Sequence, residues 1–224
     1  MSPVLFFDVN ESLLDLKALE PHFQNHFDSK VKVSDWFEQV VQTAMLSVIL
    51  GWSRNFAHVG RSALDMIASK HSVDLTERAV TDIVGGMKTL PPHPDVNPAL
   101  ESLKHSGFRM VALTNSPVAV ATNQLKYAKL INFFESVISV EEVMTLKPDA
   151  KVYRYAAEKV GSTPSESYLI ACHSWDVAGA MATGFNGALI KRPGIAIHPL
   201  APRPTIIADD LVAVADSIID RFKT

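Results

Sequence analysis

Two carboxylates follow an apolar run near the start of the chain, in the stretch SPVLFFDVNESLLDL. Residues 4–7 predict a buried strand, and Asp8 stands where that strand would end. A partly desolvated carboxylate can attack an electrophilic carbon and divide a hydrolysis into two easier steps through a covalent ester. We therefore interpret Asp8 as a candidate nucleophile, with the cap of a turn as the alternative.

Other polar groups follow later apolar runs. Thr114 and Asn115 come after FRMVAL, and with the backbone amides of the next turn they are suited to holding a substrate carboxylate. The alternative is that Thr114 or Ser116 only caps the next helix. Lys147 would keep Asp8 ionised in a closed site, and its alternative is a solvated loop lysine.

His173 ends the apolar run SYLIAC. Taken alone, a histidine in that place is more often a hydrogen-bonded core residue, and Glu11 alone is an ordinary turn carboxylate. If both face the same cleft, Glu11 could orient the imidazole while His173 takes a proton from a water molecule attacking an ester on Asp8. The pair is therefore a candidate general base.

Strands and helices alternate through the second half of the chain. Strands are predicted within residues 108–117, 134–143, 167–174 and 186–194. This alternation predicts a mostly parallel sheet with helices on both faces, which the N-terminal strand must join. Ligands of such sheets bind outside the carboxyl ends of the strands, so the polar groups described above should meet there.

Residues 15–90 instead carry apolar residues at helical spacing and predict four helices. Ser34 and Thr76 are expected N-caps, and Gly51 is an expected helix end. The proline-rich stretch PPHPDVNPAL then leads back to the sheet.

These patterns together predict an α/β fold. We expect a Rossmann-like core of residues 1–14 and 95–224, with a helical cap domain of residues 15–94 inserted between its halves. Because the insert leaves the first strand at its carboxyl end, it should lie over the site as a lid.

Composition excludes several classes of protein. The net charge is -3 without basic clusters, which argues against a nucleic-acid partner. Cys172 is the only cysteine, so no internal disulfide or clustered-thiolate zinc site is expected. The chain shows no signal-peptide pattern and no apolar run near the roughly 20 residues that span a bilayer, so we expect a cytoplasmic protein without a membrane partner. The glycine-rich nucleotide loops and the GxSxG elbow are also missing.

The strand-end groups, in this order, resemble the haloacid dehalogenase superfamily. That superfamily has an aspartate nucleophile, then Ser or Thr, then Lys, then an acidic segment, which Asp8, Thr114, Lys147 and Asp176 match over nearly the whole chain. The segments LLDL, LTNSP, LKPDAKVYRYA and HSWDVAGAMATGF look like the L-2-haloacid dehalogenase branch. A tyrosine six residues after the lysine is functional in that branch, and Tyr153 keeps this spacing.

Three places depart from that branch. Asn10 and Glu11 replace its tyrosine and glycine, and residues 171–174 read Ala-Cys-His-Ser in place of its Ser-Ser-Asn and one further residue. Phe37 aligns with its cap-helix arginine, which assists halide and substrate binding. A subgroup carries Glu and His at two of these places as a water-activating dyad, which the resemblance implies for Glu11 and His173.

Asn10 separates two activities within the superfamily. Its phosphatases generally place a second aspartate two residues after the nucleophile, as an acid for the leaving alcohol, and an amide cannot act in this way. A halide leaves without such an acid. Because this acid and an extra carboxylate near Asp176 are missing, Mg²⁺ is not expected; Asp176 should either pair with Lys147 or cap its own helix.

Aromatic residues are candidates for an apolar pocket around the halogen and alkyl chain: Phe37, Phe56, Trp52 and Trp175. Plain core packing is the alternative for each. Tyr153 is expected to hydrogen-bond in the site or to be a core residue. Four histidines lack a ligand spacing and are interpreted as cap or surface residues: His22, His26, His58 and His93.

The resemblance implies a hydrolytic L-2-haloacid dehalogenase that acts on small 2-haloalkanoic acids without a cofactor or metal and forms a homodimer. Asp8 would displace the halide, and water activated by His173 and Glu11 would hydrolyse the aspartyl ester to a 2-hydroxy acid. Two alternatives stay open: a small-molecule phosphatase of the same superfamily, and a non-catalytic relative that retains the fold.

Overall fold

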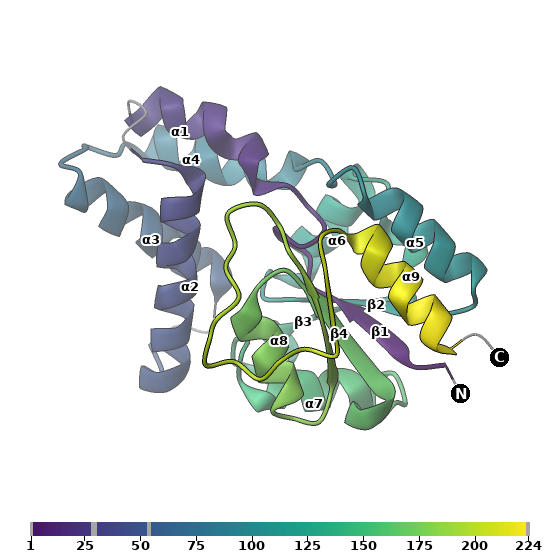
Figure 1. Ribbon diagram of the computed structural model, residues 1–224. Coiled ribbons are helices and arrows are strands. Elements are labelled where there is room, and N and C mark those ends of the chain that lie inside the picture. The colour runs from purple at the N-terminus through teal and green to yellow at the C-terminus, as the bar shows by residue number, and fades with distance from the viewer. Residues whose placement is uncertain (1, 28–30, 53–54, 223–224) are drawn as a thin grey trace.

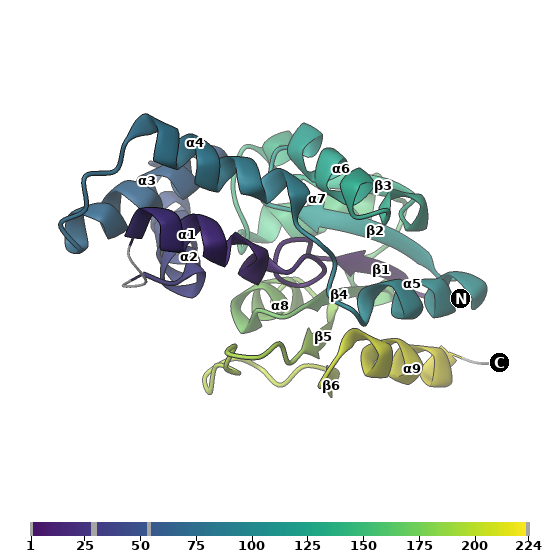
Figure 2. The same ribbon diagram turned by 90° about the horizontal axis from the view of Figure 1, so that it is seen from above.

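The computed structural model describes residues 2–27, 31–52 and 55–222. Within these residues, six parallel strands form one sheet in the order β3-β2-β1-β4-β5-β6, which Figure 2 shows from above. The strands are β1 Val4–Phe7, β2 Arg109–Thr114, β3 Ser136–Ser139, β4 Ser167–Ala171, β5 Asn186–Ile190 and β6 Ile206–Ala208. The predicted α/β fold with a parallel sheet is confirmed.

β1 lies between β2 and β4 in the sheet, and Asp8 directly follows its carboxyl end. Phe7 pairs with Ala112 of β2 on one side and with Ile170 of β4 on the other. All four residues of β1 are buried, as expected for a strand covered on both faces. β6 was not predicted, because it is a three-residue edge strand that is only partly buried and leaves no apolar run in the sequence.

Helices cover both faces of the sheet. α5 and α9 pack against each other on one face, and α7 and α8 lie together on the other (Figure 1). The helices of this part are α5 Val96–His105, α6 Val118–Tyr127, α7 Ala150–Lys159, α8 Ser174–Met181 and α9 Leu211–Phe222.

Four further helices lie between β1 and β2 in the chain. Figure 1 shows them beyond the carboxyl ends of the strands, at the end of the molecule opposite both termini. They are α1 Glu20–Phe27, α2 Val33–Leu50, α3 Phe56–Lys70 and α4 Glu77–Gly86; α2 packs on α3, and α1 packs on α4. Short 3₁₀ turns complete the order: Leu16–Leu19, Met87–Thr89, Ile131–Phe133, Val140–Val143 and Pro164–Glu166. No helix of the described ranges is long and apolar enough to cross a membrane.

Two of the three expected helix ends are confirmed. The Thr76 side chain accepts a bond from Ala79 N, and Gly51 ends α2 with a left-handed φ of 70°. The prediction for Ser34 is wrong, because α2 begins two residues earlier than expected, at Val33, and Lys32 is the N-cap. The Asp35 carboxylate accepts the Lys32 backbone N–H at 2.9 Å and so performs the capping expected of Ser34.

The two segments that join the sheet to the inserted helices are bonded to each other. Asp15 N donates to Pro91 O at 2.9 Å, and His93 N donates to Leu13 O at 3.0 Å. The outgoing segment lies directly after Asp8, so the returning segment, some 80 residues later in the chain, lies against the loop that carries Glu11.

Candidate active site

A small cavity lies between the carboxyl ends of β1, β2 and β4 and the helices α2 and α3. Only about 20 Å³ of it is open to the centre of a water molecule, which is room for about one or two waters. Its lining includes most of the predicted site residues: Asp8, Asn10, Phe37, Phe56, Thr114, Asn115, Lys147, His173 and Trp175. The sequence therefore predicted most of one connected surface.

Lys147 bridges two carboxylates at the inner end of this cavity. Its Nζ lies 3.1 Å from Asp8 Oδ1 and 2.8 Å from Asp176 Oδ2, and its side chain is 1% exposed. The alternative of a solvated loop lysine is therefore wrong. Burial alone lowers the pKa of Lys147, but the carboxylates of Asp176 and Asp8 outweigh this cost and raise the pKa above its ordinary value of 10.5. A charged ammonium thus holds Asp8 in place.

Tyr153 and Asp176 lie outside the cavity lining and support Lys147, so the expected pairing of Asp176 with Lys147 is confirmed. The Tyr153 hydroxyl donates to Asp176 Oδ1 at 2.6 Å, and burial together with Asp176 raises the pKa of this phenol well above 10.0. Gly179 permits this contact, since a Cβ there would lie 2.9 Å from the hydroxyl. Asp176 therefore pairs with Lys147 and does not cap its helix.

The carboxylates do not fit a resident divalent cation. A magnesium ion shared by Asp8 and Asp176 would need the space between them, and the ammonium of Lys147 fills it. The cation between these two carboxylates is therefore the ammonium of Lys147.

A second group of neighbouring side chains has residue types that can bind a metal ion: Glu11, Cys172 and His173. Cys172 Sγ lies 3.4 Å from His173 Nδ1 and 4.0 Å from Nε2, so the sulfur is over the face of the ring. Metals bind imidazole in the plane of the ring, and this arrangement therefore does not converge on one ion.

Ser12 is a buried partner of Asp8 that the sequence interpretation missed. Its hydroxyl donates to Asp8 Oδ2 at 2.7 Å, and its oxygen accepts the backbone N–H of Cys172 at 3.0 Å. Both oxygens of Asp8 are thus bonded, one to Ser12 and one to Lys147. A serine four residues after the nucleophile has no pattern of its own, because only the path of the loop brings it back to Asp8.

His173 and Glu11 form a pair beside the nucleophile. His173 Nε2 lies 2.9 Å from Glu11 Oε2, and its ring lies 5.5 Å from Phe37 and 5.6 Å from Trp175, measured between centroids. The two residues are more than 160 positions apart in the chain. The structure therefore brings together the pair that the sequence analysis gave as a candidate general base.

The charge of His173 depends on this pairing. Burial alone lowers its pKa, but Cys172 and the Glu11 carboxylate outweigh this and raise the pKa well above its ordinary value of 6.5. Burial also raises the pKa of the Cys172 thiol, so the sulfur is a neutral neighbour and Glu11 supplies the opposite charge. The raised pKa favours the protonated imidazole, and its basic form becomes more populated as the pH rises.

The remaining polar side chains form the wall around Asp8. Asn10 Nδ2 donates to Ser116 Oγ at 3.0 Å, and Asn10 Oδ1 accepts from Gln124 Nε2 at 3.2 Å. Both ends of this amide are therefore fixed within the wall. Gln124, which the sequence interpretation did not include, is fully buried behind it.

Thr114 and Asn115 hold the chain around the cavity. Thr114 Oγ1 accepts from Ser116 N at 3.1 Å, and Asn115 Oδ1 accepts from Lys147 N at 2.8 Å. Neither Thr114 nor Ser116 caps α6, because the helix follows Pro117 without a side-chain cap. The capping alternative is wrong, and Thr114 and Asn115 line the inner cavity next to Asp8.

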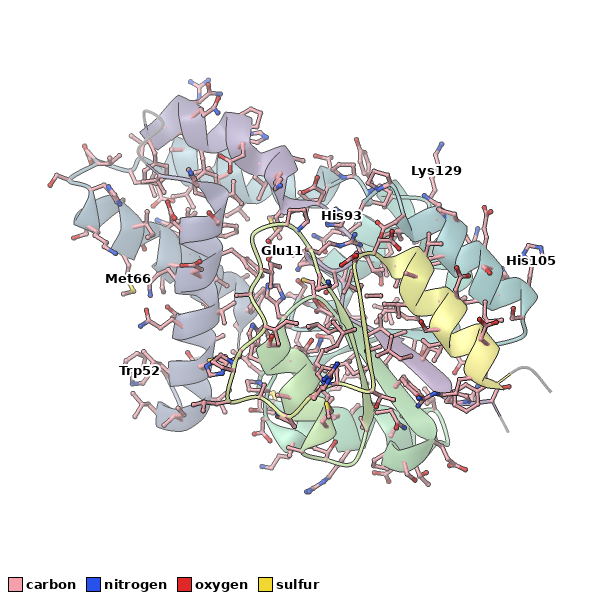
Figure 3. The ribbon with its side chains drawn as sticks, viewed as in Figure 1. Glu11, Trp52, Met66, His93, His105 and Lys129 are labelled. Atoms are coloured by element: carbon pink, nitrogen blue, oxygen red, sulfur yellow. The ribbon has the colours of Figure 1, made fainter. Side chains whose placement is uncertain are left out.

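α2 supplies an apolar wall opposite the strand ends. Phe37, Val41, Ala44 and Met45 occur at helical spacing and line the cavity together with Phe56 of α3. Trp52 does not belong to this wall: it is 64% exposed, neither cavity lining includes it, and Figure 3 shows it well apart from Glu11. The helix ends at Gly51, so Trp52 cannot continue the apolar face, and its predicted pocket role is wrong.

A second, outer cavity of about 730 Å³ lies next to the inner one. Both share a partition made of α2 residues and strand-end residues: Phe37, Val41, Met45, His173 and Trp175. Asp8 and Lys147 line only the inner cavity, whereas Glu11 lines only the outer one. The His173 ring therefore borders both spaces.

The family model for haloacid dehalogenase-like hydrolases matches residues 7–190 of this chain. The chain is 25% identical over 224 residues to an (S)-2-haloacid dehalogenase of Pseudomonas putida, covering 98% of this chain and 100% of that protein. It is 29% identical over 192 residues to (S)-2-haloacid dehalogenase 1 of Pseudomonas sp. (strain CBS-3), covering 83% of each.

The fold is similar to that of solved L-2-haloacid dehalogenases. The alignment with the L-2-haloacid dehalogenase from Xanthobacter autotrophicus covers 100% of both chains, with a TM-score of 0.91 and 20% sequence identity. A second structure of that enzyme, with chloropropionic acid covalently bound, gives a TM-score of 0.90.

Proposed function

The chain belongs to the haloacid dehalogenase-like hydrolases, and we propose that it hydrolyses L-2-haloacids to 2-hydroxy acids through an ester on Asp8. The observation that carries this proposal is that Asp8, paired with Lys147, and His173, paired with Glu11, line the same inner cavity. The first pair provides a nucleophile and the second a base for water. The relatives named (S)-2-haloacid dehalogenase support the choice of substrate.

In the first half-reaction, Asp8 attacks the carbon that bears the halogen, the carbon–halogen bond breaks, and halide leaves with the bonding electrons. Lys147 keeps Asp8 ionised, and Ser12 fixes its second oxygen. The substrate carboxylate is placed toward Thr114, Asn115 and the start of α6, where polar groups and backbone amides favour an anion. The halogen and alkyl carbon face the apolar wall of α2, Phe56 and Trp175.

In the second half-reaction, a water molecule attacks the carbonyl carbon of the Asp8 ester. His173, in its neutral form, takes the proton, and Glu11 stabilises the imidazolium that results. The acyl–oxygen bond then breaks, Asp8 is regenerated and the 2-hydroxy acid leaves. Because the outer cavity borders both His173 and Glu11, we infer that the attacking water approaches the ester from that side.

Neither alternative function gains a specific observation. A phosphatase would need an acid two residues after Asp8, and both ends of the Asn10 amide are already bonded within the wall. A non-catalytic relative would not need the buried charge of Lys147, which is costly to keep.

Single-turnover hydrolysis of L-2-chloropropionate in heavy-oxygen water tests the mechanism. The label should enter Asp8 before it appears in released product, because water attacks the ester carbonyl. Label that enters only the product would rule out the ester. A panel of L- and D-2-haloacids, scored by halide release, would establish the substrate class, and magnesium-dependent phosphate release from small esters would overturn it.

We extend the proposal to the assembly, expecting a cytoplasmic homodimer with residues 15–94 acting as a cap domain. Ile49, Leu50 and Trp52 are 75%, 53% and 64% exposed at the end of α2 and offer an apolar contact surface. Sedimentation of the wild type and of Trp52→Lys tests this: a dimer that the substitution weakens is expected, and a monomer at all concentrations would contradict it.

A further inference from the structure

Glu11 has an unusual backbone conformation for its residue type. Its φ is 66°, in the left-handed region that glycine occupies freely and other residues occupy at a cost. Such residues persist where surrounding contacts hold them, and they concentrate at functional sites. The conformation places the Glu11 carboxylate 2.9 Å from His173, so whatever holds the backbone also sets the geometry of the pair.

Two hydrogen bonds hold the main chain of Glu11. Its N–H donates to Leu14 O at 2.8 Å within the same loop. Its carbonyl accepts from His93 Nε2 at 3.0 Å, across 82 positions of sequence. Figure 3 shows His93 beside Glu11, and this contact joins the Glu11 carbonyl to the segment that returns from the inserted helices.

His93 is itself held in place. It lies on the segment that returns from the inserted helices, where its backbone N–H is bonded to Leu13 O. Burial and the charge of Arg192 lower its pKa, although Asp15 and Asp95 act in the opposite direction. The imidazole is therefore neutral, and a neutral ring that bonds a carbonyl through Nε2 must carry its hydrogen on that atom.

Arg192 secures both segments on the core. It donates to both oxygens of Asp95 at 2.8 Å and to Ser12 O at 2.8 Å, and it is 7% exposed. The returning segment, which carries His93, is thereby fixed relative to the loop of Ser12 and Glu11. His93 is therefore held in a fixed position relative to Glu11.

We propose that His93 is a positioning residue for the second half-reaction, which holds Glu11 in its left-handed conformation so that the carboxylate meets His173. This inference rests on the proposed function and adds a residue to it. His93 does not touch the reacting atoms and acts only through Glu11. It therefore serves hydrolysis of the ester and has no part in forming it.

The first test separates the two half-reactions in His93→Ala. Formation of the Asp8 adduct, followed by mass spectrometry in single turnover, should keep its rate. Hydrolysis of the adduct should slow about tenfold, as expected for loss of one buried hydrogen bond that orients a catalytic pair. The rise of the hydrolysis rate with pH should shift to lower pH. The reason is that the pKa of His173 falls when the Glu11 carboxylate is no longer well placed beside it, while Cys172 stays neutral. His93→Gln retains a side-chain N–H donor and should restore part of the rate.

A second test uses glycine in place of the strained residue. Glu11→Gly removes both the carboxylate and the need for support, so adding His93→Ala to this variant should slow adduct hydrolysis no further. The control is His105→Ala, since His105 lies far from Glu11 on the surface (Figure 3) and should leave both steps unchanged.

Three results would overturn the inference: equal slowing of both steps by His93→Ala, an unchanged pH limb, or the same loss in the Glu11→Gly background. Thermal unfolding of each variant guards against a general loss of structure. Failure of the proposed function has a different signature, namely that the wild type itself forms no adduct on Asp8.

Discussion

Two carboxylate–cation sets lie side by side in this protein, and they are built differently. The set around Lys147 joins Asp8 and Asp176, is almost completely buried, and is fixed by bonds to Ser12 and Tyr153. The other set, Glu11 with His173, borders the outer cavity, and its carboxylate is 24% exposed.

The difference teaches how one site can support two kinds of chemistry. Lys147 stays charged, because the two carboxylates outweigh its burial and raise its pKa above 10.5, and this charge beside Asp8 suits an ionised nucleophile. The His173 set has one partner and contact with water, so it can change its protonation state. Substitutions in the two sets should therefore have separable effects.

The largest effect is expected in the Lys147 set. Asp8→Asn removes the nucleophile and should lower the rate of halide release by roughly 10⁴-fold or more. Lys147→Met should also prevent adduct formation and should cost about 3–5 kcal/mol of stability, since it leaves two buried carboxylates without their cation. Halide release and denaturant unfolding measure these outcomes. Near-normal adduct formation in Lys147→Met would break the comparison.

His173→Ala should separate the sets most clearly. Adduct formation continues, because Asp8 and Lys147 are intact, but hydrolysis should fall by roughly 10²–10⁴-fold for loss of a general base. Intact-mass measurement after substrate addition should therefore show a stable adduct, and peptide mapping should place it on Asp8. If turnover is unchanged, His173 is not the base.

Glu11→Gln tests the charge dependence of the pair. In the wild type, hydrolysis should rise with pH through the raised pKa of His173, because only the neutral imidazole accepts a proton. Removing the Glu11 charge lowers that pKa, so the rise should occur at lower pH, with a slower limiting rate.

The same shift has a consequence for stability. A raised folded-state pKa stabilises the protein fully below the unfolded value of about 6.5, and this contribution is lost as the pH rises through the folded value. The stability difference between wild type and Glu11→Gln should therefore shrink with rising pH. A difference that grows instead would contradict the assignment.

The smallest effect concerns the wall that both cavities share. Met45→Ala enlarges the space beside the α2 wall, so longer 2-haloacids should gain roughly tenfold in kcat/KM relative to chloroacetate, on the scale of one methylene in an apolar pocket. Met66→Ala is the matched control, because Met66 is 49% exposed on α3 and lies outside both linings. Equal changes of kcat/KM in both variants would contradict the role of Met45 in this wall.

The sequence predicted the fold well where burial leaves a local pattern. The run that forms β1, the alternation of strands and helices and the helical insert were all visible, and the ends of α2 and α4 at Gly51 and Thr76 were correct. The misses have local causes. β6 is too short and too exposed to carry a pattern, and Ser34 lost its expected role because Asp35 was in reach of the Lys32 N–H.

The site shows the same difference between features with a local sequence pattern and features without one. The sequence by itself determined that Asp8, Thr114 and Lys147 would gather at one edge, because parallel strands present their carboxyl ends together. Tertiary structure alone decided what each side chain does there. It places the Ser12 hydroxyl against Asp8 and the Tyr153 hydroxyl against Asp176. It also leaves Trp52 exposed and bonds His93 to the backbone of Glu11. These contacts depend on loop paths and side-chain directions that long-range packing fixes, and no pattern of neighbouring residues encodes them.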